Sequence, residues 1–273
     1  MSLMCQSLRV SRSGYYTWLS RPESDRSRSN SRLLSEVRIV HKRSRRCYGS
    51  PRVTAELKES GFACSENRVA RLMRINGIHA KRKRKYRATT DSKHSYPVAP
   101  NLLDRQFTVD RPNAVWVSDI TYIRTSEGWL YLAAIVDLYS RMVVGWSMGN
   151  RINGQLTLDA LKQAIGRRHP QPGLIHHSDR GRQYAAVDYQ NMLKDNKMIC
   201  SMSRKGDCWD NAPMESFFAT LKTELIYREQ LKTQEEVKTR IFEYIEVFYN
   251  RERRHSSLGF KNPVDFERAA TLS

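Results

Sequence analysis

Three apolar runs separated by short polar turns constrain the fold of this chain more than any other feature. They cover residues 114–123 (AVWVSDITYI), 129–136 (WLYLAAIV) and 142–147 (MVVGWS). Their β-branched and aromatic side chains favour strands, and the turns at 126–128 and 137–140 are short enough for hairpins. We therefore predict an antiparallel meander of three strands.

Helical and strand-like patterns alternate downstream of this meander. A helix is predicted where apolar residues recur three or four positions apart, and a strand where a short apolar run stands between turn signals. By these criteria helices cover 156–165, 186–196, 212–225 and 234–249, and two further strands cover 174–177 and 198–202. Residues 113–273 are therefore expected to form one α/β domain with five strands.

Positive charge is concentrated in the N-terminal part of the chain. Residues 1–100 contain 23 Lys and Arg against 7 Asp and Glu, so they hold +16 of the total charge of +19. This asymmetry favours a module that binds a polyanion, joined to a nearly neutral domain. A merely solvated basic surface is the alternative. Binding to an anionic membrane is disfavoured, because no amphipathic helix carries large apolar residues opposite the basic ones.

The sequence also bears on the compartment. No apolar run approaches the length of a membrane span, and the first residues lack a signal-peptide pattern, so we expect a cytoplasmic, nucleoid-associated protein. The cysteines lack the short spacing of a zinc knuckle and are odd in number, which favours reduced thiols. They are Cys5, Cys47, Cys64, Cys200 and Cys208.

The basic part begins with an arm and a helical module. Residues 1–31 are interpreted as an N-terminal helical arm and a Ser/Arg-rich linker, whose role the sequence leaves open. Residues 32–80 contain two short helices joined by a Gly-containing turn, which predicts a helix-turn-helix DNA-binding module. Its second helix carries Arg68, Arg71 and Arg74 at three-residue spacing. We predict that these arginines contact DNA, and a solvated charged face is the alternative.

Residues 81–112 are predicted to form a basic linker. The segment begins KRKRKYR, with six positive charges in seven positions, and Pro97 and Pro100 punctuate the remainder. A flexible spacer is the simpler interpretation, but such a run also binds phosphates through counterion release. The DNA contacts expected here are Lys81, Arg82, Lys83, Arg84 and Lys85.

Three carboxylates stand out in the C-terminal domain, although each has an ordinary explanation. Asp119 interrupts an apolar strand, where a carboxylate is costly unless charge is supplied to it, and alternation gives it the face of Val115 and Val117. Asp179 follows a strand and fits a cap of the next turn. Glu215 lies in the first turn of a helix, where it complements the helix dipole. Only the three acids together indicate a site.

Several segments resemble a known family. They read WVSDITYIRTSEGWLYLAAIVDLYSRMVVGWSM, HHSDRGRQY, SMSRKGDCWDNAPMESFFATLK and YIEVFYNRERRHSSLGFKNP. They look like the integrase core of bacterial insertion-sequence transposases, of the second-frame (OrfB) type found in two-frame, frameshifting elements. The segment YGSPRVTAELKESGFACSENRVARLM is similar to the helix-turn-helix that precedes this core. The resemblance covers residues 30–270.

The resemblance implies a ribonuclease-H-like fold for residues 113–273, with a mixed five-stranded sheet flanked by helices. It implies a DDE-type transposase that cleaves DNA at the element ends and joins the freed 3′-hydroxyl to another phosphodiester. The family's acids fall on Asp119, Asp179 and Glu215, which would bind two Mg²⁺ ions, with Mn²⁺ as a substitute. The basic residue that the family carries after its glutamate falls on Lys222, a predicted DNA contact.

The implied partners are DNA, as terminal inverted repeats and target, a second copy of the chain in a synaptic complex, and the upstream-frame product or a fusion with it. Arg253 and Arg254, in the basic turn after the last long helix, are further predicted DNA contacts. Two other functions remain open. One is a DNA-binding regulator without catalysis, and the other is a ribonuclease-H-like nuclease acting on RNA–DNA hybrids.

Other polar residues near the acids are given structural interpretations. His176 and His177 lack the additional nitrogen or sulfur ligands of a zinc site, so we expect them to pack within a strand. Asp137 lies in a turn and is expected to be structural. Trp209 and residues 206–211 are predicted to form a mobile loop over the site.

Overall fold

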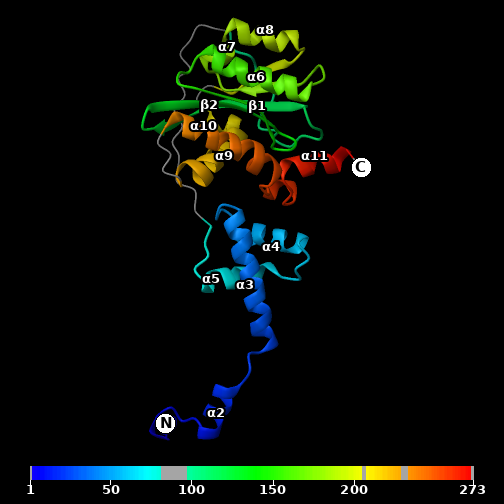
Figure 1. Ribbon diagram of the computed structural model, residues 1–273. Helices are drawn as coiled ribbons and strands as arrows, with labels where there is room; N and C mark the ends of the chain where they lie inside the picture. Colours follow the sequence, from blue (N-terminus) through cyan, green and yellow to red (C-terminus); the bar gives the residue numbers. More distant parts are fainter. Residues whose placement is uncertain (1, 81–96, 205–206, 229–232, 272–273) are drawn as a thin grey trace. The chain divides into compact units, whose positions relative to one another are not determined.

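The computed structural model describes residues 2–80, 97–204, 207–228 and 233–271 (Figure 1). The chain divides into two compact units, residues 1–80 and residues 81–273. Within the described ranges, no helix has the length and apolar character needed to cross a membrane.

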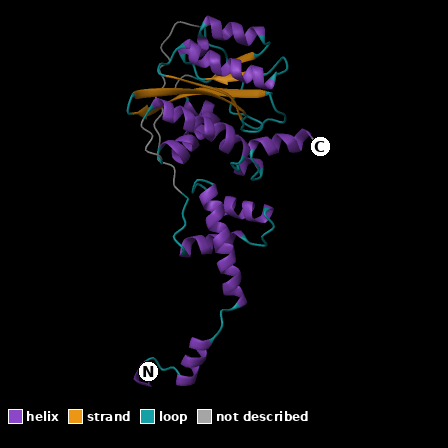
Figure 2. Cartoon of the chain, in the orientation of Figure 1, coloured by secondary structure: helices purple, strands orange, loops and turns teal. Residues whose placement is uncertain are grey.

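The first unit is built from helices (Figure 2). They are α1 (Ser2–Ser7), α2 (Arg12–Ser20), α3 (Asp25–Arg43), α4 (Ser50–Glu59) and α5 (Glu66–Ile75). The last three pack around one apolar core, to which they contribute the fully buried Val37, Val53 and Val69. The chain turns between α4 and α5 at Gly61, where a φ of +85° favours glycine.

α3 begins earlier than the sequence pattern indicated. Residues 21–31 were expected to be a linker, but the helix already begins at Asp25. Ser24 caps it by accepting a hydrogen bond from the Ser27 amide, and Asp25 complements the positive end of the helix dipole. The linker prediction is wrong over residues 25–31, because a helix whose first turns are largely exposed shows no apolar periodicity.

The second unit contains one five-stranded sheet, in the order β3–β2–β1–β4–β5. Its strands are β1 (Val115–Thr125), β2 (Gly128–Asp137), β3 (Val143–Gly149), β4 (Ile175–Ser178) and β5 (Ile199–Met202). The first three pair with antiparallel neighbours, whereas β4 and β5 extend the sheet from β1 in parallel. The predicted meander and the mixed five-stranded sheet are both confirmed.

Helices cover both faces of the sheet (Figure 1). α6 (Gly154–Arg168), α7 (Arg182–Ala185) and α8 (Val187–Asp195) lie on one face, and α9 (Ala212–Leu221), α10 (Gln234–Glu243) and the terminal α11 (Pro263–Thr271) lie on the other side. α9 continues into the π-helical segment Lys222–Ile226, and α10 into Tyr244–Tyr249. Alternation along β1 places Trp116 in the core beneath α6 and Val117 in the core beneath α9.

α6 approaches β3 closely at Gly145. A Cβ at this position would lie 2.3 Å from the Ala160 carbonyl oxygen and 2.7 Å from the Ala164 Cβ. No side chain fits in that space, so the glycine sets how closely the helix packs on the sheet.

Residues 97–112 pack on the second unit and do not form the linker that was predicted. Leu103 is 3% exposed and belongs to the apolar cluster beneath α9. The Leu102 amide donates a 2.9 Å hydrogen bond to Ser201 Oγ. The prediction fails here because isolated apolar side chains in a polar segment give no periodic signal. The other residues of the predicted linker, 81–96, lie outside the described part of the chain, with the predicted contacts Lys81, Arg82, Lys83, Arg84 and Lys85.

Candidate active site

The parallel pairing of β1 with β4 brings two of the predicted acids to neighbouring strands. Val117 pairs with His177 in this register, and Asp119 and Asp179 each follow two residues later. Asp119 remains inside β1, whereas Asp179 is the first residue after β4. Both side chains are partly exposed. By alternation Asp119 belongs to the face of Val117, which α9 covers.

The third acid is carried by the helix that covers this face. A 3₁₀ turn (Cys208–Asn211) leads into α9, and Glu215 lies in the first turn of that helix. Asn211 Nδ2 donates a 3.2 Å hydrogen bond to the carbonyl oxygen of Ser118, the residue before Asp119. The start of α9 is therefore attached to β1 beside the first acid.

The charges of the three acids act on one another. The pKa of Asp119 is raised well above its usual value, first by burial, then by the charge of Asp179, and also by that of Glu215. The hydrogen bond from the Ile120 amide and the charge of Lys222 act in the opposite direction. Burial also raises the pKa of Glu215. Three carboxylates from separate elements thus share one electrostatic environment, in which like charges disfavour full ionisation.

The acids do not form a finished three-ligand cage. Across the residues described, no three His, Cys, Asp or Glu side chains converge closely enough to hold one metal ion together. The like-charge effects on Asp119 come from both Asp179 and Glu215, so Asp119 is the acid that the other two influence.

Asp179 is held by a tight turn. Its Oδ1 accepts a 2.8 Å hydrogen bond from the Gly181 amide, and Arg180 Nε donates to the Ser203 carbonyl oxygen at 2.6 Å. A Cβ on Gly181 would lie 2.2 Å from Gln183 Nε2 and 2.9 Å from Asp179 Oδ1. A side chain at Gly181 would therefore displace Gln183 and crowd the carboxylate of Asp179.

Lys222 lies next to the acids and is buried. Its side chain is 5% exposed, and its Nζ is 5.2 Å from the centre of the Tyr122 ring. Burial lowers the pKa of Lys222, and the charge of Asp119 opposes that shift. The predicted DNA contact at Lys222 thus remains a prediction, for a lysine that feels the charge of Asp119.

Arg253 does not fit the DNA contact that was predicted for it. It is 5% exposed, and its guanidinium donates two hydrogen bonds of 2.8 Å to Glu224, while Arg254 donates to the Phe260 carbonyl oxygen at 2.9 Å. Burial alone would lower the pKa of Arg253, but Glu224 keeps it above its usual value. Arg253 is a structural residue, and its buried partner 29 positions upstream left no local signal in the sequence.

The three arginines of α5 differ in their surroundings. Arg68 is half-buried and donates to Asn30 Oδ1 at 2.9 Å and to Ser29 Oγ at 2.8 Å, so it joins α5 to α3. Arg71 is half-buried and Arg74 is exposed. Arg71 and Arg74 therefore remain the better candidates for a DNA contact.

The histidines and Asp137 have the structural surroundings that were expected. His177 lies between Ser201 Oγ at 2.8 Å and Ser203 Oγ at 3.1 Å, and burial lowers its pKa to about 4. Burial also lowers the pKa of His176 to about 3. Asp137 is fully buried and accepts hydrogen bonds from the backbone of residues 113 and 139 and from the Trp116 indole.

The turn before α9 differs from the mobile loop that was predicted. Residues 208–211 form the 3₁₀ turn, and Gly206 lies outside the described residues. Trp209 is 66% exposed, but its neighbour Asp210 is fully buried. Sequence reasoning did not single out Asp210. The position of an aspartate directly before the helix start Asn-Ala-Pro is the signal that was available.

Comparisons with known proteins agree with this architecture. Residues 109–208 and 196–263 each match the family described as "Integrase core domain", and residues 28–86 match "HTH-like domain". A chain of the simian T-cell lymphotropic virus intasome in complex with PP2A regulatory subunit B56 gamma has a TM-score of 0.50 at 14% identity, covering 84% of this chain and 73% of that one. That likeness concerns the fold. The class is therefore a DDE-type recombinase with a ribonuclease-H-like integrase core.

Two relatives narrow the class. The chain is 49% identical over 263 residues to "Insertion element IS600 uncharacterized 31 kDa protein" of Shigella sonnei, covering 96% of this chain and 97% of the relative. It is 46% identical over 266 residues to "Transposase InsF for insertion sequence IS3A" of Escherichia coli (strain K12), covering 97% and 92%. The chain belongs to the IS3 family of insertion-sequence transposases.

Proposed function

We propose that this transposase cleaves DNA strands at the ends of its insertion sequence and transfers the freed 3′ ends, with Asp119, Asp179 and Glu215 as the catalytic carboxylates. The observation that carries the proposal is the placement of the acids: Asp119 and Asp179 follow a paired position of β1 and β4 by two residues each, and Glu215 lies on the helix that covers the face of Asp119. Gathering like charges from a strand, a loop and a helix costs stability, so it favours a functional explanation.

The donor set fits a pair of hard divalent cations. Carboxylate oxygens are the ligands that Mg²⁺ and Mn²⁺ prefer, and Lys222 supplies one positive charge beside three negative ones. Asp119, Asp179 and Glu215 would hold these ions between them. When bound, such ions supply electrostatic stabilisation to the attacking and the leaving oxygens.

The reaction consists of two displacements at phosphorus. In the first, the oxygen of water bonds to phosphorus while the bond to the 3′ oxygen breaks, which leaves a 3′-hydroxyl and a 5′-phosphate. In the second, that hydroxyl attacks another phosphodiester, so one such bond forms as one breaks. The protein's part is to hold the acids in place: the Gly181 amide orients Asp179, and the start of α9 orients Glu215.

DNA recognition is assigned to both units. We propose that α5 of the helix-turn-helix contacts the element end through Arg71 and Arg74. Because Lys222 is buried beside Asp119, its contact with DNA would be limited to a phosphate at the acids themselves. Joining two ends of one element requires that both be held at once, so we propose that the chain acts as a homo-oligomer on paired ends.

Substitution of each acid in the full chain tests the proposal. Asp119→Ala, Asp179→Ala and Glu215→Gln are expected to abolish nicking of a labelled element end in Mg²⁺, while binding of that end stays measurable. Asp195→Ala, at the exposed end of α8, is the control and is expected to cleave normally. A variant of the three that still nicks the end would refute the assignment, and cleavage of an RNA–DNA hybrid in preference to element ends would favour a nuclease.

A further inference from the structure

The aspartate directly before α9 is held by several donors at once. Asp210 lies in the 3₁₀ turn Cys208–Asn211, and its side chain has no exposed surface. Its Oδ1 accepts from Arg105 Nε at 3.0 Å and from Arg204 Nη2 at 2.7 Å. Its Oδ2 accepts from Asn101 Nδ2 at 2.9 Å, from the Arg204 amide at 2.8 Å and from Arg204 Nε at 3.0 Å. We call Asn101, Arg105, Arg204 and Asp210 the Asp210 cluster.

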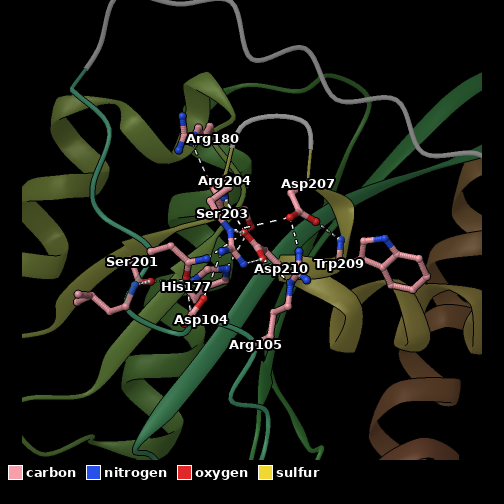
Figure 3. Close-up of polar contacts among 12 residues, drawn as sticks. Asp104, Arg105, His177, Arg180, Ser201, Ser203, Arg204, Asp207, Trp209 and Asp210 are labelled. Atoms are coloured by element: carbon pink, nitrogen blue, oxygen red, sulfur yellow. Dashed lines mark hydrogen bonds and ion pairs between the residues drawn. The ribbon is translucent and has the colours of Figure 1, made fainter.

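The Asp210 cluster joins segments that are far apart in the sequence (Figure 3). Arg105 and Arg204 reach the carboxylate from the segment before β1 and from the exit of β5, respectively. His177 lies in the same view and feels the charge of Asp210. One residue after Asp210, Asn211 bonds to the backbone of β1 beside Asp119. The cluster therefore ties the start of α9 to the segment before β1 and to the exit of β5, and Asn211 ties it to β1 beside Asp119.

The cluster specifies geometry more than it adds stability. The Arg105 and Arg204 side chains are 45% and 47% exposed, so water screens their guanidinium groups, although the Asp210 carboxylate itself is fully buried. A planar guanidinium bound through two nitrogens nevertheless fixes direction as well as distance. Loss of this geometry is therefore expected to alter the turn without unfolding the unit.

We propose that Asp210 is a positioning residue, whose carboxylate fixes the turn from which α9 starts and so sets where Glu215 lies relative to Asp119. This inference rests on the proposed function of the three acids. Glu215 follows Asp210 by five residues, within the first turn of the helix, so a shift of the turn moves the glutamate directly. Displacements of about 1 Å in a catalytic constellation can cost about 100-fold in rate.

Asp210→Asn in the full chain is the test. It keeps the size of the side chain, removes its charge and turns one acceptor into a donor that faces Arg204 or Asn101. At saturating element-end DNA the cleavage rate is expected to fall about 100-fold, with the affinity for that DNA unchanged. The matched control is Asp104→Asn, which loses an exposed ion pair 3.3 Å from the same Arg204 and should cleave within about twofold of the wild type.

Hydrogen exchange supplies a readout that general destabilisation does not mimic. Asp210→Asn is expected to speed exchange at the Arg204 amide and in the first turn of α9, while α6 and the sheet keep the wild-type pattern. Arg105→Gln, which removes the hydrogen bond to Asp210 and the ion pair with Asp207, is expected to lower the rate about tenfold with the same local pattern. This second variant keeps the proposal testable should Asp210→Asn fail to fold.

Two results would overturn the inference. One is a wild-type cleavage rate in Asp210→Asn or Arg105→Gln while Glu215→Gln is inactive. This result would support the catalytic role of the acids and contradict the positioning role of Asp210. The other is a loss of cleavage accompanied by faster exchange throughout α6 and the sheet, which makes Asp210 a general stability residue. If Glu215→Gln itself still cleaves, the proposed function fails, and the positioning role fails with it.

Discussion

Replacing Arg253 with methionine tests whether this arginine acts as a buried partner of Glu224, as the structure shows, or as the DNA contact predicted from sequence. The Arg253 and Glu224 side chains are 6% and 7% exposed and meet through two hydrogen bonds of 2.8 Å. Tyr244 donates a third hydrogen bond to the same carboxylate, also at 2.8 Å. Removal of the arginine would leave the carboxylate buried without its guanidinium partner.

The expected loss is large for a single substitution. Breaking a buried ion pair by removing one partner costs about 3–5 kcal/mol, because the remaining charge is uncompensated. In a unit of about 190 residues, 1 kcal/mol lowers Tm by about 2–4 °C, so Arg253→Met should lower Tm by about 6–20 °C. The double variant Glu224→Gln with Arg253→Met removes both charges and keeps an acceptor for Tyr244, so it should recover part of the loss.

Calorimetry and a DNA-binding titration distinguish an Arg253 that is buried against Glu224 from an Arg253 that contacts DNA. Arg251→Met, an exposed arginine two residues earlier, is the matched control and should change Tm by less than about 2 °C. Anisotropy with labelled element-end DNA at several salt concentrations gives the number of phosphate contacts. A wild-type Tm for Arg253→Met, together with a salt slope reduced by about 0.9, would show that Arg253 binds a phosphate and that its burial has been misread.

Other outcomes follow from packing, protonation and charge. Gly145→Ala should lower the free energy of unfolding by about 1–3 kcal/mol or more, because the added Cβ meets the Ala160 carbonyl oxygen. The control Gly166→Ala, in open space on α6, should raise the free energy of unfolding by up to about 1 kcal/mol. Equal urea midpoints for the two variants would contradict this prediction. Burial lowers the pKa of His176 from 6.5 to about 3, so His176 is protonated in the unfolded chain at a higher pH than in the folded chain. The free energy of unfolding should therefore fall by about 1.4 kcal/mol per pH unit as the pH drops from 6.5 towards 3. His176→Gln should lack this contribution to the pH dependence of the free energy of unfolding. Identical pH profiles for the variant and the wild type would contradict the prediction. Deletion of residues 1–90 should remove most DNA affinity, and an unchanged salt slope in a mobility-shift assay would mean that the basic part does not bind DNA.

The sheet could be predicted because its residues carry a local signal. The β-branched runs of β1, β2 and β3 mark strands by composition alone, and the short turns between them leave an antiparallel arrangement as the simplest one. Alternation also assigned Asp119 to the face of Val117, which the helix carrying Glu215 covers. These predictions depend only on residues that are close to one another along the chain.

The failures concern residues whose surroundings come from distant parts of the sequence. Arg253 is buried because Glu224 supplies a charge, and Leu103 because the sheet offers an apolar surface. Asp210 is held in part by Asn101 and Arg105, which lie more than one hundred positions upstream. No periodicity marks such pairs. The polar start of α3 failed for another reason, since capping by Ser24 stabilises a helix that buries little.

The attachment of residues 101–105 has a mechanical consequence. A pull on this segment acts on Asp210 through Asn101 and Arg105, and on β5 through Pro100 and Leu102. The load therefore reaches the beginning of α9 and strand β5 together. A displacement of residues 101–105 would in this way act on the start of the helix that carries Glu215.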